Sequence, residues 1–149
     1  MDRLVRTTIA TLALLAVCGL TPLLHRDALA GQEQARSGAC SLNTMKGTHG
    51  YSYSGTVMGD PIAAVGPITF DGAGNLSATY DVNWGGTPFH GGFTGTYTVD
   101  VECTGTVTLH LPVLGVSTDG AFVIINNGKE TFFMGVDPGV TVTGATKRL

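Results

Sequence analysis

Two runs of alternating side chains between Phe93 and Leu111 constrain the fold more than any other part of the sequence. One side of the runs carries Phe93, Gly95, Tyr97 and Val99, then Val101, Cys103, Gly105, Val107, Leu109 and Leu111. Threonines fill most positions on the other side. Side chains that alternate with a period of two predict half-buried antiparallel strands, and threonine suits the solvated face of a pleated sheet. The sequence therefore predicts a central β-hairpin.

Further strands are predicted at similar spacing along the chain. They cover residues 47–58, 63–70, 76–84, 121–125, 130–136 and 140–147. Glycine-rich turns at 71–75, 126–129 and 137–139 separate several of them. Residues 41–46 suit one helical turn, 83–88 form a loop, and 112–120 form an irregular link with a short edge piece at 113–116. The apolar segment 121–125 is expected to be a strand that is buried on both faces or lies at a crowded corner.

About eight short strands joined by short turns predict an all-β, up-and-down antiparallel barrel. An open sheet of this size would leave two edges that a chain without long helices cannot cover, whereas closure removes them. A two-sheet β-sandwich is the alternative. The barrel is preferred because Greek-key crossovers need longer connections than this sequence offers.

Residues 1–30 are predicted to be a secretory signal peptide and are excluded from the fold. Arg3 and Arg6 precede an apolar run over 7–24, and Ala28 and Ala30 supply a small-x-small cleavage pattern. A transmembrane anchor is one alternative. Lipid attachment at Cys18 is another, although Val17 is larger than the residue a lipobox places there. The protein is therefore expected to be secreted or periplasmic, with a flexible lead at 31–39, a single domain at 40–149 and no membrane span after cleavage.

After cleavage the chain keeps two cysteines, Cys40 and Cys103. In an oxidising compartment this pair predicts one disulfide between the start of the domain and the central hairpin. A reactive thiol at Cys103 is the alternative, and the neighbouring Glu102 opposes it because a carboxylate raises the pKa of a thiol. Residues 31–149 hold five basic and nine acidic side chains, which excludes a basic groove for nucleic acid.

Several segments together are similar to a known group of proteins. They are an early Cys40 before a Gly-x-Tyr strand, the stretch 68–75, the pair of stretches 95–99 and 103–106, and the terminal stretch 143–148. In these features the chain resembles small secreted bacterial proteins of uncharacterised function, which look like members of the allene oxide cyclase barrel-like group, relatives of the calycin barrels. The resemblance implies a barrel but no reaction, and no active-site residues of the plant cyclase can be carried over to this sequence.

No catalytic, cofactor or metal motif stands out in the sequence. His49, His90 and His110 lack the spacing of a zinc site, no serine sits in a nucleophile elbow, and the 71–75 turn lacks the spacing of a calcium loop. Aromatic side chains on inward faces are candidates to line a ligand cavity, or to fill a narrow barrel interior. They are Tyr51, Tyr53, Tyr80, Trp84 and Tyr97.

These features favour a non-catalytic secreted or periplasmic barrel that binds a small apolar ligand or a surface partner. An isomerase or cyclase of the allene oxide cyclase type is an alternative that rests on resemblance of fold. A structural protein of the cell envelope is a second alternative, which lipidation at Cys18 would favour.

Overall fold

The computed structural model describes residues 39–112 and 115–149. Its strands are β1 (Gly47–Val57), β2 (Asp60–Phe70), β3 (Asn75–Trp84), β4 (Thr87–Tyr97), β5 (Thr104–Leu111), β6 (Val116–Ile125), β7 (Glu130–Gly135) and β8 (Val140–Arg148). Two short helical turns accompany them, α2 (Leu42–Met45) and η2 (Asn126–Gly128). The predicted signal peptide and nearly all of the predicted lead lie outside the described residues. No helix within the described ranges is long and apolar enough to span a membrane.

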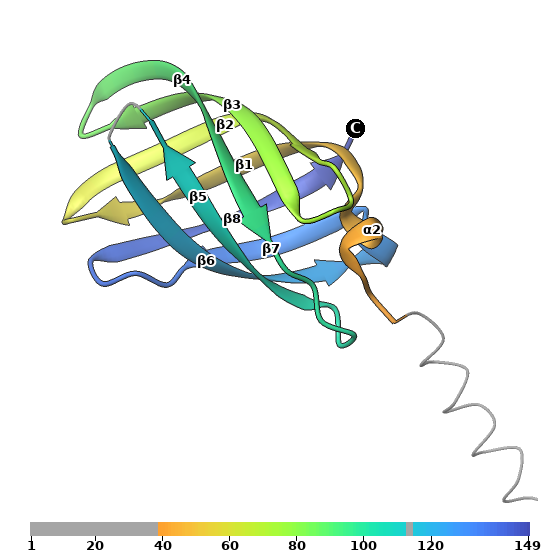
Figure 1. Cartoon of the computed structure of the whole chain (residues 1–149). Helices are drawn as coiled ribbons and strands as arrows, with labels where there is room; N and C mark the ends of the chain where they lie inside the picture. The colour runs from red at the N-terminus through yellow and green to blue at the C-terminus, as the bar shows by residue number, and fades with distance from the viewer. Residues whose placement is uncertain (1–38, 113–114) are drawn as a thin grey trace, which may run out of the picture. The chain divides into compact units, whose positions relative to one another are not determined.

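The eight strands form a closed antiparallel barrel, as the sequence predicts, and the sandwich alternative is wrong (Figure 1). Each strand pairs with the next in the chain, and β8 closes the barrel by pairing with β1. In this register Tyr53 of β1 faces Ala64 of β2 on one side and Gly144 of β8 on the other. Closure leaves no free edge between these strands.

In the central hairpin, the predicted apolar face points into the barrel and the predicted threonine face points to solvent. Phe93 and Tyr97 are buried, whereas Thr94, Thr96 and Thr106 are exposed. Hydroxyl contacts between neighbouring strands follow this outer face, such as Thr98 Oγ1 to Thr106 Oγ1 at 2.8 Å. The predicted run is wrong only at Val101, which is 65% exposed. The chain turns there, since the backbone N–H of Cys103 donates to the carbonyl of Asp100, and β5 begins at Thr104.

The predicted irregular link at 112–120 is also wrong, because β6 already begins at Val116. Asp119 and Gly120 suggest a turn by residue type, but contacts outside the segment keep them in a strand. The Asp119 N–H donates to the Asp137 carboxylate at 2.8 Å, and its own carboxylate accepts a hydrogen bond from Thr108. The segment 121–125 is not buried on both faces either, because Val123 is 38% exposed.

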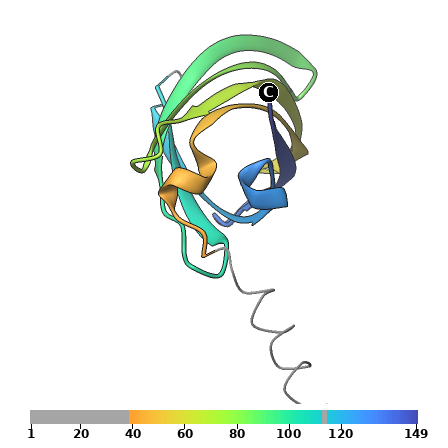
Figure 2. The ribbon, with the colours of Figure 1, turned by 90° about the vertical axis from the view of Figure 1, so that its right-hand side faces the viewer.

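The two helical turns α2 and η2 lie at one end of the barrel (Figure 2), and a disulfide reinforces this end. The disulfide joins Cys40 to Cys103 across 63 residues, as predicted, and so anchors the chain ahead of α2 to the β4–β5 turn. Met45 of α2 is 1% exposed and packs into the core. Asn126, Asn127 and Gly128 have φ values of 54°, 54° and 78°, which suits their residue types and lets the chain reverse beneath α2. We call this the closed end, and the opposite one the open end.

Five inward-facing glycines mark places where the barrel wall bends sharply. They are Gly55, Gly66, Gly95, Gly105 and Gly144. At each of them a Cβ atom would lie closer than 3.0 Å to a backbone carbonyl oxygen of a neighbouring segment. Glycine kinks of this kind let a β-sheet curve enough to close.

Candidate functional site

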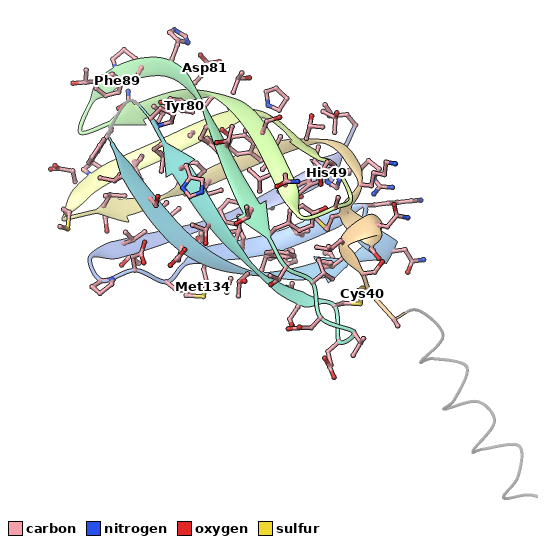
Figure 3. All side chains as sticks on the ribbon, in the orientation of Figure 1. Cys40, His49, Tyr80, Asp81, Phe89 and Met134 are labelled. Carbon is pink, nitrogen blue, oxygen red and sulfur yellow. A yellow bond between two sulfur atoms is a disulfide. The ribbon has the colours of Figure 1, made fainter. Side chains whose placement is uncertain are left out.

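A buried chain of polar side chains crosses the closed end. His49 is 0% exposed and lies in β1, four residues after the last residue of α2 (Figure 3). Its Nε2 is 3.2 Å from the carbonyl oxygen of Met45, which can only accept, so Nε2 carries the proton. Nδ1 then accepts from the Thr146 hydroxyl at 3.3 Å, and Thr146 is 2.9 Å from the hydroxyl of Thr131. Each of these side chains has a hydrogen-bond partner within the protein. The network therefore holds α2 against the barrel and leaves no donor free for a ligand.

Burial lowers the pKa of His49, and the nearby Arg148 adds to this effect, while the hydrogen bond to Met45 opposes it. An unfolded histidine binds a proton below about pH 6.5, whereas folded His49 stays neutral to lower pH. The contribution of His49 to stability is therefore complete above that pH and is lost as the pH falls through the lowered pKa.

We expect the free energy of unfolding to decrease between about pH 7.5 and pH 5, and His49→Gln to flatten that decrease. The measurement is the urea midpoint at both pH values. His110→Gln is the matched control, because His110 is exposed on the outer wall and contacts Ser117 at 2.8 Å. An unchanged slope in His49→Gln would contradict the assignment.

A second polar contact joins α2 to the β2–β3 turn. The Tyr97 hydroxyl donates to the carbonyl of Leu42 and accepts from the N–H of Gly72, both at 3.1 Å. In the same turn the Asp71 carboxylate accepts bonds from the N–H groups of Ala73 and Asn75 and from the Asn75 side chain, which together lower the pKa of Asp71. These protein donors occupy the carboxylate oxygens, so the turn has the contacts of a hairpin.

The predicted cavity-lining aromatics lie at three levels of the interior. Tyr97 is at the closed end, in edge contact with Phe70 at 5.1 Å between ring centroids. Tyr51, Tyr53 and Tyr80 lie at the middle level, where Tyr51 stacks on Tyr53 at 6.1 Å and Tyr80 on Phe93 at 6.2 Å. Burial raises the pKa of Tyr51 and of Tyr53. Trp84 is at the open end, so the structure does not gather the five around one site.

The open end is lined by inward side chains that are half-buried, in contrast to the buried residues at the closed end. They are Val57, Ile62, Val82, Trp84, Leu109, Leu111 and Val140. The indole Nε1 of Trp84 is buried and has no hydrogen-bond partner among the described residues. A buried donor without a partner costs about 1–3 kcal/mol, so such a group calls for an explanation.

Charge is distributed unevenly between the two ends. The cationic side chains of the described chain all lie at the closed end: Lys46 directly after α2, Lys129 directly after η2, and Lys147 and Arg148 at the end of β8. Two acidic residues lie at the open end, where Asp60 begins β2 and Asp137 lies in the β7–β8 turn, and no cation of the described chain lies beside them; four other acidic residues, Asp71, Asp100, Glu102 and Glu130, lie at the closed end with the cations. A ligand that approaches the open end therefore meets negative charge.

The remaining histidines do not form a catalytic cluster in the described structure. His90 contacts Asp81 on the outer wall, with both side chains largely exposed, and His110 pairs with Ser117 on β5 and β6. Among the described residues, no group of three or more histidine, cysteine or acidic side chains is placed to hold a metal ion.

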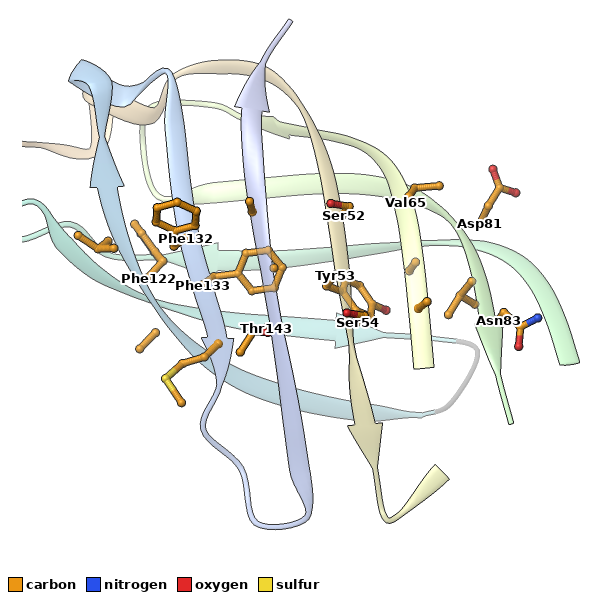
Figure 4. Close-up of a pocket in the computed structure, with 18 of the residues that line it drawn as sticks. Ser52, Tyr53, Ser54, Val65, Asp81, Asn83, Phe122, Phe132, Phe133 and Thr143 are labelled. Carbon is orange, nitrogen blue, oxygen red and sulfur yellow. The ribbon is translucent and has the colours of Figure 1, made fainter. Parts of the chain in front are cut away.

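A shallow groove of about 1360 Å³ runs over the outer wall of the barrel (Figure 4). Its residues follow the hydrogen-bonding direction from strand to strand. Across the part formed by β2, β1, β8, β7 and β6, the outward pairs are Val65 with Ser52, Ser52 with Ala145, Ala145 with Phe132, and Phe132 with Val123. This volume exceeds that of a typical small-molecule pocket, about 300–1,000 Å³, and the groove is open to solvent. Its form suits a macromolecular surface better than a small ligand.

Large apolar side chains project from this wall. Phe132 is 56% exposed, Met134 53% and Val65 53%, and Met134 points away from the barrel in Figure 3. This surface was not among the sites predicted from the sequence. The available signal was the run Phe132, Phe133 and Met134, which is apolar on both faces of a single strand.

Comparison with known proteins identifies the fold only. A solved structure of a redesigned β-barrel aligns with 76% of this chain and 99% of that chain, at 18% identity and a TM-score of 0.55. No protein-family model matches the sequence, and no curated protein matches it. The likeness supports the barrel that the sequence resemblance implied, while membership of the allene oxide cyclase barrel-like group stays a prediction.

Proposed function

We propose that this protein is an exported, non-catalytic binding protein that takes a neutral, apolar small molecule into the open end of its barrel. The observation that carries the proposal is the buried indole N–H of Trp84, which lacks a partner among the described residues. It lies among apolar side chains that remain half-buried in the free protein. A ligand with an apolar body and one acceptor oxygen would cover these side chains and satisfy the N–H.

The charge of the open end supports a neutral ligand over an anionic one. Asp60 and Asp137 lie at this end, and the four cations of the described chain lie at the other. A carboxylate would therefore meet like charge without a cation to pair with, whereas a carbonyl or hydroxyl oxygen carries no such penalty. The buried His49 is engaged by Met45 and Thr146, so it supports a role in folding and not in acid–base chemistry.

Trp84 is the only tryptophan in the sequence, so its emission reports directly on this site. We expect 2-dodecanone to change the Trp84 emission in a saturable way, and dodecanoate to bind at least about tenfold more weakly. Absence of saturable binding by the ketone, or tighter binding of the carboxylate, would refute the proposal.

A pair of variants at the end of β1 locates the site. Val57 points inward and is half-buried, whereas its neighbour Thr56 points outward. Val57→Trp should fill the open end and abolish displacement of the neutral probe N-phenyl-1-naphthylamine by 2-dodecanone, and Thr56→Trp should leave it unchanged. Equal behaviour of the two variants would place the ligand elsewhere and contradict the proposal.

A further inference from the structure

The groove on the outer wall combines a ridge and a hollow on adjacent strands. Phe132 and Met134 of β7 form the ridge, since both are more than half exposed. The hollow lies over β8 and β1, where the outward residues are small: Thr143, Ala145, Ser52 and Ser54. Ridge and hollow are in direct register, because Phe132 pairs with Ala145 and Met134 with Thr143.

A ridge beside a hollow of similar length is self-complementary under a twofold axis. If two copies face each other with the axis between β7 and β8, the ridge of each copy enters the hollow of the other. Apolar side chains of two facing sheets interdigitate in this way at a sheet separation of about 10 Å. Association through strand edges is not available to this barrel, because each of its strands is already paired on both sides.

The charges of the described chain also favour a second copy over a charged partner. It carries four cationic and eight acidic side chains, so two copies repel over most of their surface. The outward groove residues of β1, β8, β7 and β6 are uncharged. Over these four strands two copies therefore meet without repulsion, and the acidic lining residues Asp81 and Asp100 lie outside them, on β3 and in the β4–β5 turn.

We propose that the groove across β2, β1, β8, β7 and β6 is the contact surface of a symmetric dimer of this chain, in which Phe132 and Met134 of one copy pack into the hollow over Ala145, Thr143, Ser52 and Ser54 of the other. This proposal is independent of ligand binding at the open end, because the two sites lie on opposite faces of the barrel wall.

Sedimentation velocity over a range of concentrations tests the proposal on purified protein whose N-terminus has been defined by mass spectrometry. The expected result is a reversible monomer–dimer equilibrium. Met134→Lys should raise the dissociation constant at least about tenfold, because it places a charge within the contact. Val136→Lys is the matched control: Val136 is 54% exposed but lies past the end of β7, outside the groove residues, and should leave the dimer intact.

A third variant distinguishes specific ridge-and-hollow packing from non-specific hydrophobic association. Ala145→Trp fills the hollow but adds apolar surface. Specific packing therefore predicts that the variant associates more weakly than the wild type, whereas non-specific association predicts that it associates more strongly. A protein that stays monomeric at all concentrations, an Ala145→Trp variant that associates more strongly, or equal effects of the two lysine variants would overturn the proposal. Thermal melts of each variant establish that it is folded, and the fluorescence titration of Trp84 shows whether ligand binding stands when dimerisation fails.

Discussion

Removing the Cys40–Cys103 disulfide is expected to lower the free energy of unfolding by about 4 kcal/mol, the value for a loop of 63 residues in the chain-entropy model. The bond acts mainly by lowering the conformational entropy of the unfolded chain, because it keeps the segment ahead of α2 close to the β4–β5 turn. For a domain of this size the loss corresponds to a decrease in Tm of about 15–20 °C. The measurement is a thermal melt of Cys40→Ala/Cys103→Ala.

The reduced wild-type protein is the control for this variant. If the effect comes from the covalent link, both forms should melt at the same temperature, and the Trp84 emission of both should match that of the oxidised protein below the transition. A double variant with an unchanged Tm would show that α2 and the polar contacts of His49 and Tyr97 hold the closed end without the bond.

Gly144→Ala is expected to destabilise the barrel by about 3 kcal/mol, although it adds a single methyl group. The new Cβ would lie closer than 3.0 Å to the carbonyl oxygen of Ser52 and to atoms of Tyr53 and Phe133. Neither the backbone of β1 nor the two packed rings can give way without opening the wall between β8 and β1. The urea midpoint measures the effect.

Gly50→Ala is the matched control in the same pair of strands. Gly50 pairs with Lys147 of β8, and its Cβ would meet no atom closer than the flexible Leu149 side chain, at 3.3 Å. This variant should change the stability by no more than about 0.5 kcal/mol. Equal losses in the two variants would mean that the alanine side chain disturbs these strands by a mechanism other than the close approach of the wall.

The sequence predicts the barrel because most of its strands alternate with one period. Thr94, Thr96, Phe93 and Tyr97 take the faces that their residue types favour, and the disulfide follows from two cysteines alone. The predicted start of the strand at residue 121 was wrong for a physical reason, since β6 begins at Val116. Asp119 and Gly120 resemble a turn locally, but the Asp137 carboxylate and the Thr108 hydroxyl, both distant in sequence, keep them in a strand.

The candidate sites are less visible in the sequence. The inward aromatic residues were recognised, yet only the register shows that Trp84 lies at the other end of the barrel from Tyr97. The ridge of Phe132 and Met134 was missed because a run of apolar residues predicts burial on both faces, whereas this wall has an apolar outer face. The buried pair Thr131 and Thr146 was missed as well, since threonines elsewhere in these strands face water.

Closure of β8 onto β1 also governs how the molecule is made. The two strands that complete the wall stand at opposite ends of the described sequence, so the last hydrogen-bonded seam requires the most distant residues to meet. Contacts of such long sequence separation form slowly, because the chain loses entropy before they can stabilise it. A polypeptide that emerges with its N-terminus first cannot complete this seam until its C-terminal strand has appeared. Until then β1 is paired with β2 alone and forms an exposed edge of the sheet, which needs protection from aggregation.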